Sequence, residues 1–171
     1  MAKIGIYGGS FNPVHFGHIG LAEWVVAHTD LDEVWLMVSP NNPLKDPATL
    51  ADEQVRMEQV RAAIAGKRGL VALDFEFHLP RPTYTAETLR ALVKAYPEHT
   101  FTLIIGADNL GIFYKWRDYT YILAHYRVFV YPRRGYQSAD IPNTGNICVL
   151  HDAPYFDISS TEIRNNLQVQ K

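Results

Sequence analysis

A short apolar run, a glycine-rich turn and a segment of helical spacing open the chain, and this order constrains the fold more than any other feature. Residues 3–7 have the apolar character of a buried strand, residues 8–17 form the turn, and apolar residues recur at helical spacing through residues 17–28. Glycines let a backbone come close to a ligand, and a helix start offers unpaired N–H groups and the positive end of its dipole. The opening therefore predicts a phosphate site on an α/β scaffold.

Apolar runs and helical patterns continue to alternate along the chain. We predict strands over residues 3–7, 33–39, 70–74, 100–105, 127–131 and 147–150. We predict helices over residues 17–28, 51–65, 85–95, 119–124 and 160–167. Strands separated by helices favour a parallel sheet with right-handed crossovers, so the predicted fold is a doubly wound α/β domain. Ligands bind such sheets beyond the carboxyl ends of the strands, which directs attention to the loops over residues 8–17, 40–49, 78–83, 106–118 and 132–145.

Composition narrows the class of protein. The 171 residues are 47% hydrophobic and 20% charged, which suits a single domain over residues 1–171 with a real core. A net charge of -2 argues against a broad nucleic-acid surface, and no apolar run approaches the roughly 20 residues that span a bilayer. Met1 leads almost directly into the first strand, so we expect no signal peptide. The single cysteine, Cys148, suits a reduced, cytoplasmic setting.

Two histidines, His15 and His18, flank Gly17 at the predicted start of the first helix. They could be helix-entry residues or a zinc pair, although no obvious partner completes a tetrahedral zinc site. We favour phosphate binding, because imidazole N–H groups that donate to phosphoryl oxygens stabilise the charge that builds up during phosphoryl or nucleotidyl transfer.

A second polar segment lies near the end of the chain. Ser159, Ser160 and Thr161 can cap the predicted helix over residues 160–167 and present hydroxyl and N–H groups to a phosphate, while Arg164 could grip the same group as a planar fork. Taken alone, this segment is equally an ordinary helix cap with a surface arginine.

Together, residues 8–18 and 158–164 resemble the G-x-F-N-P-x-H-x-G-H and I-S-S-T-x-I-R motifs of the nucleotidyltransferase superfamily. Residues 80–89, residues 105–109 with the downstream Trp116, and residues 131–136 resemble segments of bacterial nicotinate mononucleotide adenylyltransferases, and Lys45 matches a lysine of that family. Thr83 replaces the usual serine and Arg134 the usual proline. The resemblance covers about residues 3–166 and implies a Rossmann-like nucleotidyltransferase fold.

This resemblance implies roles for individual residues. The catalytic residues would be His15, His18 and Arg164. The ATP-binding residues would be Gly8, Gly9, Ser10, Phe11, His15, Gly17, His18, Gly106, Asp108, Arg133, Ile158, Ser159, Ser160, Thr161 and Arg164. The mononucleotide would be bound by Asn12, Lys45, Thr85, Ala86 and Trp116, with Trp116 stacked on the pyridine ring and backbone N–H groups near Thr85 receiving the carboxylate. Each has a plainer alternative: Trp116 as a core aromatic, Asp108 as a helix cap, Lys45 as a solvated charge.

The implied reaction joins ATP to nicotinate mononucleotide and releases pyrophosphate. Mg²⁺ would accompany ATP, held mainly by phosphate oxygens and water, with no ligand from protein side chains. The alternatives are a phosphopantetheine adenylyltransferase, which usually has threonine at the position of His15, and a nucleotide-binding sensor on the same fold. The family usually continues through a further helix and a tail, whereas this chain ends seven residues after Arg164, so we expect a short C-terminal tail. The sequence leaves open the oligomeric state and the preference for the acid over the amide mononucleotide.

Overall fold

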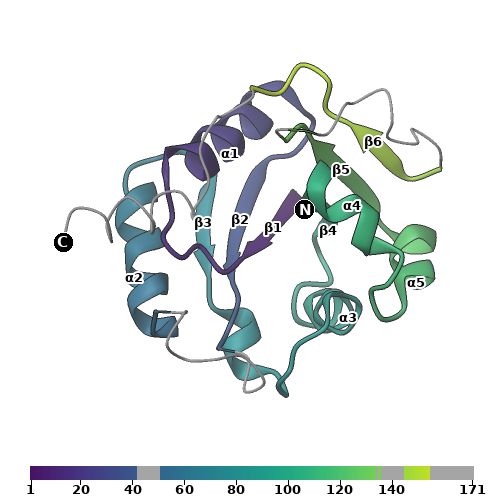
Figure 1. Cartoon of the computed structure of the whole chain (residues 1–171), viewed down its shortest axis with the longest axis horizontal. Coiled ribbons are helices and arrows are strands. Elements are labelled where there is room, and N and C mark those ends of the chain that lie inside the picture. The colour runs from purple at the N-terminus through teal and green to yellow at the C-terminus, as the bar shows by residue number, and fades with distance from the viewer. Residues whose placement is uncertain (42–50, 134, 136–144, 155–171) are drawn as a thin grey trace.

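The computed structural model describes residues 1–41, 51–133, 135 and 145–154, and these form one parallel sheet covered by helices (Figure 1). The strands of the described part are β1 (Lys3–Gly9), β2 (Glu33–Val38), β3 (Leu70–Leu73), β4 (Thr100–Gly106), β5 (Arg127–Tyr131) and β6 (Ile147–Val149). Its helices are α1 (Phe16–His28), α2 (Glu53–Ile64), α3 (Thr85–Ala95), α4 (Ala107–Phe113) and α5 (Tyr119–His125), with a 3₁₀ turn η2 (Phe75–His78). No helix of the described part is both long and apolar enough to span a membrane.

The predicted strands, and the predicted helices other than the one over residues 160–167, are confirmed to within about two residues, and that last helix lies outside the described residues. The predicted second helix began too early, because Asp52 caps α2 with its side-chain Oδ1, which accepts a hydrogen bond from Gln54 N at 2.8 Å. The loop predicted over residues 106–118 was wrong in part, since it contains α4, and η2 was not predicted. Both elements are too short to show a helical period in sequence.

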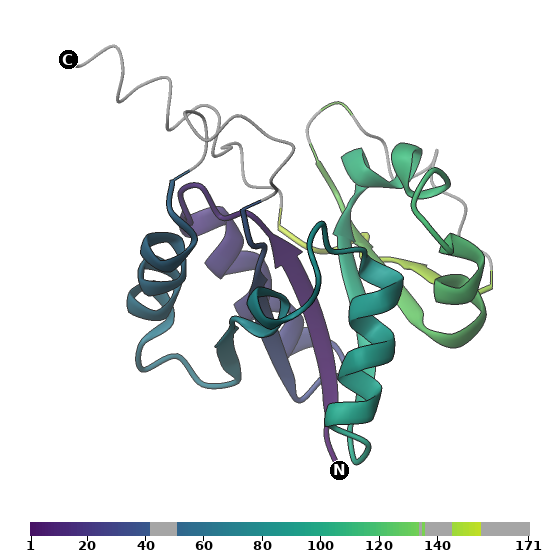
Figure 2. The ribbon, with the colours of Figure 1, turned by 90° about the horizontal axis from the view of Figure 1, so that it is seen from below.

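The sheet order is β3-β2-β1-β4-β5-β6, and every paired neighbour is parallel. Helices α1 and α2 lie on one side of the sheet and α3, α4 and α5 on the other, as Figure 2 shows. A separate apolar cluster packs each group of helices against its face of the sheet. At Gly5 the cluster that contains α1 and α2 leaves little room for a side chain, because a Cβ there would lie 2.7 Å from Ile104 Cδ1 and 2.8 Å from Leu31 Cδ1. The result is the doubly wound, Rossmann-like fold that the sequence predicts.

The order of the strands reverses at β1. The chain runs outward from β1 through β2 to β3 and then returns to the other side of β1 as β4. Crossovers on the two sides of this point lie on opposite faces of the sheet, so the loops after β1 and β4 diverge and leave a crevice at the carboxyl edge. The glycine turn after β1 and the segment after β4 therefore face a common space.

Candidate active site

The turn after β1 places two histidine rings at the start of α1. His15 is the residue that caps the helix, and its Nδ1 accepts a hydrogen bond from Gly17 N at 3.0 Å. His18 Nδ1 in turn accepts from His15 N at 3.1 Å, and the two rings stack with their centroids 3.7 Å apart. Because backbone N–H groups are always donors, both Nδ1 atoms must be acceptors. Each neutral ring therefore carries its proton on Nε2 and offers an Nε2–H donor.

Burial keeps His18 uncharged. Burial, together with the neighbouring His15 and Arg133, lowers the pKa of His18 to about 3. The edge of the Phe11 ring lies against the imidazole, with centroids 4.9 Å apart. Phe11 holds a φ of +47°, a left-handed backbone conformation that a non-glycine residue seldom adopts. His18 is thus held as a neutral donor. The same two rings bond the backbone at the start of α1 through Nδ1 and carry an N–H donor at Nε2.

A small hollow in front of these rings is lined by residues from several segments. It is lined by Tyr7, His15, Gly17, His18, Tyr131 and Arg133, among others. The Arg133 guanidinium supplies positive charge there, and its Nε lies 3.8 Å from Asp108 Oδ1 at the start of α4. The segment after β5 therefore contributes a cation to the histidine side of the crevice.

A larger cavity of about 220 Å³ opens on the other side, between the ends of β1 and β4. Its lining includes Gly8, Gly9, Ser39, Glu76, Thr85, Gly106, Asn109, Trp116 and Tyr131. Thr85 is the first residue of α3, and Tyr84, which precedes it, makes no side-chain cap hydrogen bond. A helix start without a side-chain cap presents its N–H groups and positive dipole end to whatever lies before it. This cavity suits a flat ring beside Trp116 and an anion at α3.

Tyr131 lines both hollows. Its hydroxyl lies 3.5 Å from that of Tyr7, and burial raises the pKa of both phenols, so both stay protonated. A Cβ at Gly106 would lie 2.5 Å from Asp108 Oδ1 and 3.0 Å from Tyr131 Oη. The glycine at the end of β4 therefore lets the tyrosine and the start of α4 approach closely.

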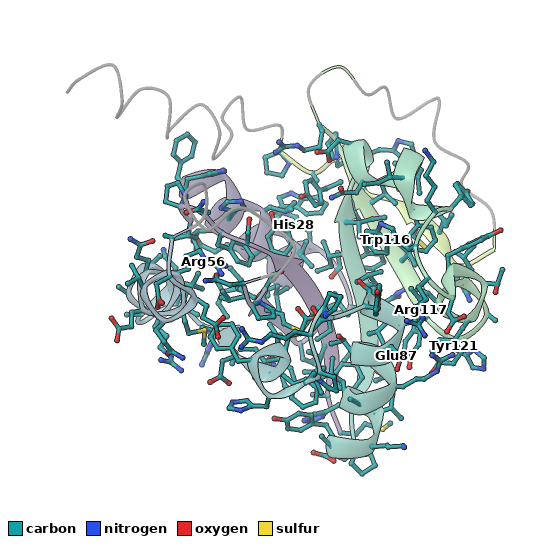
Figure 3. The ribbon with its side chains drawn as sticks, turned by 60° about the horizontal axis from the view of Figure 1, so that its bottom comes forward. His28, Arg56, Glu87, Trp116, Arg117 and Tyr121 are labelled. Carbon is teal, nitrogen blue, oxygen red and sulfur yellow. The ribbon has the colours of Figure 1, made fainter. Side chains whose placement is uncertain are left out.

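Arg56 is the functional residue that the sequence analysis missed most clearly. It is fully buried, and its Nη1 donates to the carbonyls of Ser10 and Ser39, both at 2.8 Å. Its Nη2 donates to Asn41 Oδ1 at 2.7 Å and its Nε to the carbonyl of Ala51 at 2.9 Å. One guanidinium thus joins the turn after β1 to the segment after β2. Figure 3 labels Arg56 beside α2.

A second contact from α2 reaches the loop before α3. The carboxylate of Glu53 accepts two hydrogen bonds from Arg81, at 2.6 and 2.7 Å, and this pairing lowers the pKa of the carboxyl. Its Oε1 also accepts from Asn41 N at 3.1 Å. Glu53 and Arg56, in the first turn of α2, therefore bind three segments that border the crevice. These are the turn after β1, the segment after β2 and the loop before α3.

The structure brings together many of the predicted site residues and leaves others outside. Those that line one of the two hollows are Gly8, Gly9, His15, Gly17, His18, Gly106, Thr85, Trp116 and Arg133. Asn12 is buried, and its Oδ1 accepts from Ala51 N at 3.4 Å; Ala86 is fully buried. Lys45, Ile158, Ser159, Ser160, Thr161 and Arg164 lie outside the described residues, so their roles remain predictions.

Sequence reasoning also assigned no role to Glu76, Asn109 and Tyr131. Asn109 and Tyr131 lie within the family-like segments 105–109 and 131–136, whereas Glu76 belongs to no motif. Arg56 did leave a signal, because it lies four and eight residues before Val60 and Ile64, on the buried face of α2. A charged residue at an apolar position of a helix is a candidate for a buried, bonded role.

The described residues contain no group of three or more His, Cys, Asp or Glu side chains placed to hold a metal ion. A divalent ion bound with a triphosphate draws most of its ligands from phosphate oxygens and water, and needs no such group.

Comparison with known proteins shows the family of this chain. A cytidylyltransferase-like family model matches residues 6–166. Proteins named probable nicotinate-nucleotide adenylyltransferase match nearly the whole chain: that of Bacteroides fragilis is 45% identical over 169 residues, which cover 99% of this chain and 84% of the relative. That of Flavobacterium johnsoniae is 42% identical, with 99% and 88% covered.

The chain belongs to the nicotinate-nucleotide adenylyltransferase family. It is accordingly a nucleotidyltransferase, and the family predicted from its motifs is confirmed. A solved structure described as a putative nicotinate-nucleotide adenylyltransferase from Vibrio parahaemolyticus is 26% identical, covers 100% of this chain and 90% of its own, and has a TM-score of 0.72. A Plasmodium falciparum nicotinic acid mononucleotide adenylyltransferase in complex with NaAD is 19% identical, covers 96% and 83%, and shares the fold at a TM-score of 0.79.

Proposed function

We propose that this enzyme transfers the adenylyl group of ATP to nicotinate mononucleotide, forming nicotinate adenine dinucleotide and pyrophosphate. The observation that carries the proposal is the meeting of two different hollows at Tyr131, in the crevice where the strand order reverses. One offers imidazole donors and an arginine, as a polyphosphate requires. The other offers an aromatic face and the start of α3, as an anionic aromatic ring requires.

ATP would lie on the histidine side. The Nε2–H groups of His15 and His18 would donate to phosphate oxygens, with His18 on the α-phosphate, and Arg133 would add a positive charge nearby. Ser10 and the segment from Ser159 to Arg164 would hold the rest of the triphosphate, which remains a prediction from the motif.

The mononucleotide would lie in the larger cavity. The Trp116 ring would stack on the pyridine, and the N–H groups of Thr85 and Ala86 at the start of α3 would receive the nicotinate carboxylate. Lys45 and Asn12 would complete this side near the mononucleotide phosphate.

The chemistry needs positioning and charge stabilisation rather than proton transfer. The attacking 5′-phosphate is already ionised at neutral pH, so it can attack the α-phosphorus in line without a base. His18 could not serve as that base, because its Nδ1 is occupied by the His15 N–H and its Nε2 carries a proton. Its donor bond strengthens as negative charge collects on the phosphoryl oxygens in the transition state. A magnesium ion bound to the triphosphate would neutralise part of that charge and of the departing pyrophosphate.

The direct test supplies ATP and Mg²⁺ with nicotinate mononucleotide, nicotinamide mononucleotide or phosphopantetheine in parallel and measures pyrophosphate. We expect release with nicotinate mononucleotide. Release with phosphopantetheine alone would favour the alternative enzyme, and no release with any acceptor would favour a nucleotide-binding sensor. A cytoplasmic location remains a prediction from the sequence.

A further inference from the structure

A buried carboxyl group lies in the wall of the acceptor cavity. Glu76, in η2, is 6% exposed and lines the same cavity as Thr85 and Trp116. Among the residues that the structure describes, Thr88 is the hydrogen-bond partner of its carboxyl group, and no cation pairs with it. Burial raises the pKa of this carboxyl, and the hydrogen bond from Thr88 offsets that shift only in part.

The hydrogen-bond geometry at Thr88 also accommodates an uncharged Glu76. Thr88 Oγ1 lies 2.7 Å from Glu76 Oε2 and 3.1 Å from the carbonyl oxygen of Tyr84. A hydroxyl has one proton, so it can donate to only one of these two acceptors when Glu76 is ionised. When Glu76 is protonated, it donates to Thr88 and Thr88 donates to Tyr84, so both contacts are hydrogen bonds. Tyr84 is the residue that precedes α3, so this series of two hydrogen bonds ends at the start of α3.

Other charged groups near Glu76 are already engaged or face away. On its own turn, His78 lies 3.7 Å from Asp74, and both are exposed. On α3, Glu87 and Arg90 form an exposed pair at 3.7 Å, and Lys94 follows on the same outer side. On β2, Glu33 accepts from the Trp35 indole, and in the cavity the Tyr131 phenol stays protonated. The carboxylate of an acid mononucleotide held at Thr85 would share this cavity with Glu76.

We propose that Glu76 is a specificity-determining residue, which must be uncharged when the acid mononucleotide is bound, so that this acceptor enters the site together with a proton. The proposal rests on the proposed function. Two carboxylates within one cavity of about 220 Å³ repel each other, and at the effective dielectric constant of a protein site this lowers affinity on the order of tenfold or more. The amide mononucleotide lacks this carboxylate, so no such repulsion opposes its binding to the ionised form.

The test compares the KM of the two mononucleotides between pH 5.5 and 9, because the titration of their shared phosphate cancels in the ratio. For the wild type, we expect the ratio of the KM of the acid to that of the amide to rise with pH, on the order of tenfold across the range, with kcat little changed. In Glu76→Gln, whose amide N–H₂ can donate to Thr88 as the protonated acid does, the ratio should stay flat. Glu87→Gln, an exposed glutamate of α3 outside the cavity, should behave as the wild type. If the amide mononucleotide is too poor a substrate, its inhibition constant takes the place of KM.

A flat ratio in the wild type, or the same rise in Glu76→Gln, would overturn the proposal. So would a Glu76→Gln enzyme that binds the acid more tightly by the same factor at every pH, because that would mean an ionised glutamate throughout. Titration calorimetry in two buffers of different ionisation enthalpy gives a second readout, since proton uptake should accompany the acid mononucleotide in the wild type only.

Stability measures the charge of Glu76 without any substrate. A raised pKa means that its contribution to folding is fully present below its ordinary pKa of 4.5 and is lost as the pH rises. The urea midpoint of Glu76→Gln, measured relative to that of the wild type, should therefore increase between pH 4.5 and 8. If the wild type forms no pyrophosphate with either mononucleotide, the proposed function fails. If it uses the acid while the ratio stays flat and the midpoints run parallel, only the inference about Glu76 fails.

Discussion

Two helices begin at the same edge of the sheet, and their starts are built differently. At α1 the side chains of His15 and His18 take up the first backbone N–H groups, so that the rings, not the backbone, face a ligand. At α3 the preceding residue, Tyr84, makes no side-chain cap bond, so the backbone N–H groups themselves are presented. A ring N–H group can donate to negative charge that develops during a reaction, whereas the N–H groups of a helix start suit a charge that stays in place. The contrast matches a reacting polyphosphate at α1 and a fixed carboxylate at α3.

The cap on α1 holds only while His18 is neutral, and acid should break it. The pKa of His18 is about 3 in the folded chain against 6.5 ordinarily, so the unfolded chain binds the extra proton first as the pH falls. Stability should decline from pH 6.5 towards 3, by on the order of 4 kcal/mol from this group. Urea unfolding of the wild type and His18→Asn across this range measures the difference. His78→Asn, at an exposed histidine, should run parallel to the wild type, and a wild-type curve parallel to that of His18→Asn would contradict the expectation.

Removing the donor at α1 should harm catalysis more than folding. His18→Ala deletes the Nε2–H, and turnover should fall roughly 100- to 1000-fold, as for the loss of one donor to a developing charge. Loss of the cap should cost only about 1 kcal/mol of stability. Pyrophosphate release and thermal unfolding separate these effects, with His78→Ala as the control. Turnover within a few-fold of the wild type would remove His18 from the reaction.

Arg56 binds both the turn beside the histidines and the segment beside the larger cavity, so its loss should affect both substrates. Arg56→Lys keeps the charge but cannot reach the carbonyls of Ser10, Ser39 and Ala51 together with Asn41. A misplaced loop of this kind lowers kcat/KM roughly 100-fold, and we expect that loss for ATP and for the mononucleotide alike. Arg61→Lys, on the exposed face of α2, is the matched control. A loss confined to one substrate would show that the two loops are positioned independently.

The start of α3 can be tested by deleting one backbone donor. Thr85→Pro removes the N–H of Thr85 at the first helical position, where proline is tolerated, and the extended backbone of Tyr84 (φ -126°, ψ 137°) suits a residue before proline. The KM of nicotinate mononucleotide should rise about tenfold, as for a lost hydrogen bond to a charged group. Thr85→Ala, which keeps the N–H, should leave it unchanged. If both variants raised KM equally, the side chain rather than the backbone would hold the acceptor.

The sequence predicted α1 and its histidines well, because the strand, the glycines and the two rings are close in the chain and their contacts are local. The doubly wound sheet followed from apolar runs alone, in the same way. Arg56 and Glu76 were missed because their partners lie far away in sequence: Ser10 is 46 residues from Arg56, and Thr88 is 12 from Glu76. A local sequence pattern does not show which distant carbonyl a buried donor will reach. Helix α4 is too short to show a helical period in the sequence.

Arg56 also has a consequence for how the two substrates bind. Its Nη1 is shared between the carbonyl of Ser10, on the loop predicted to hold ATP, and that of Ser39, beside the acceptor cavity. A shift of one loop when its substrate binds therefore acts on the other loop through the same guanidinium. We expect each substrate to change the affinity for the other even though they occupy separate hollows, which the Kd of each in the presence and absence of the other measures.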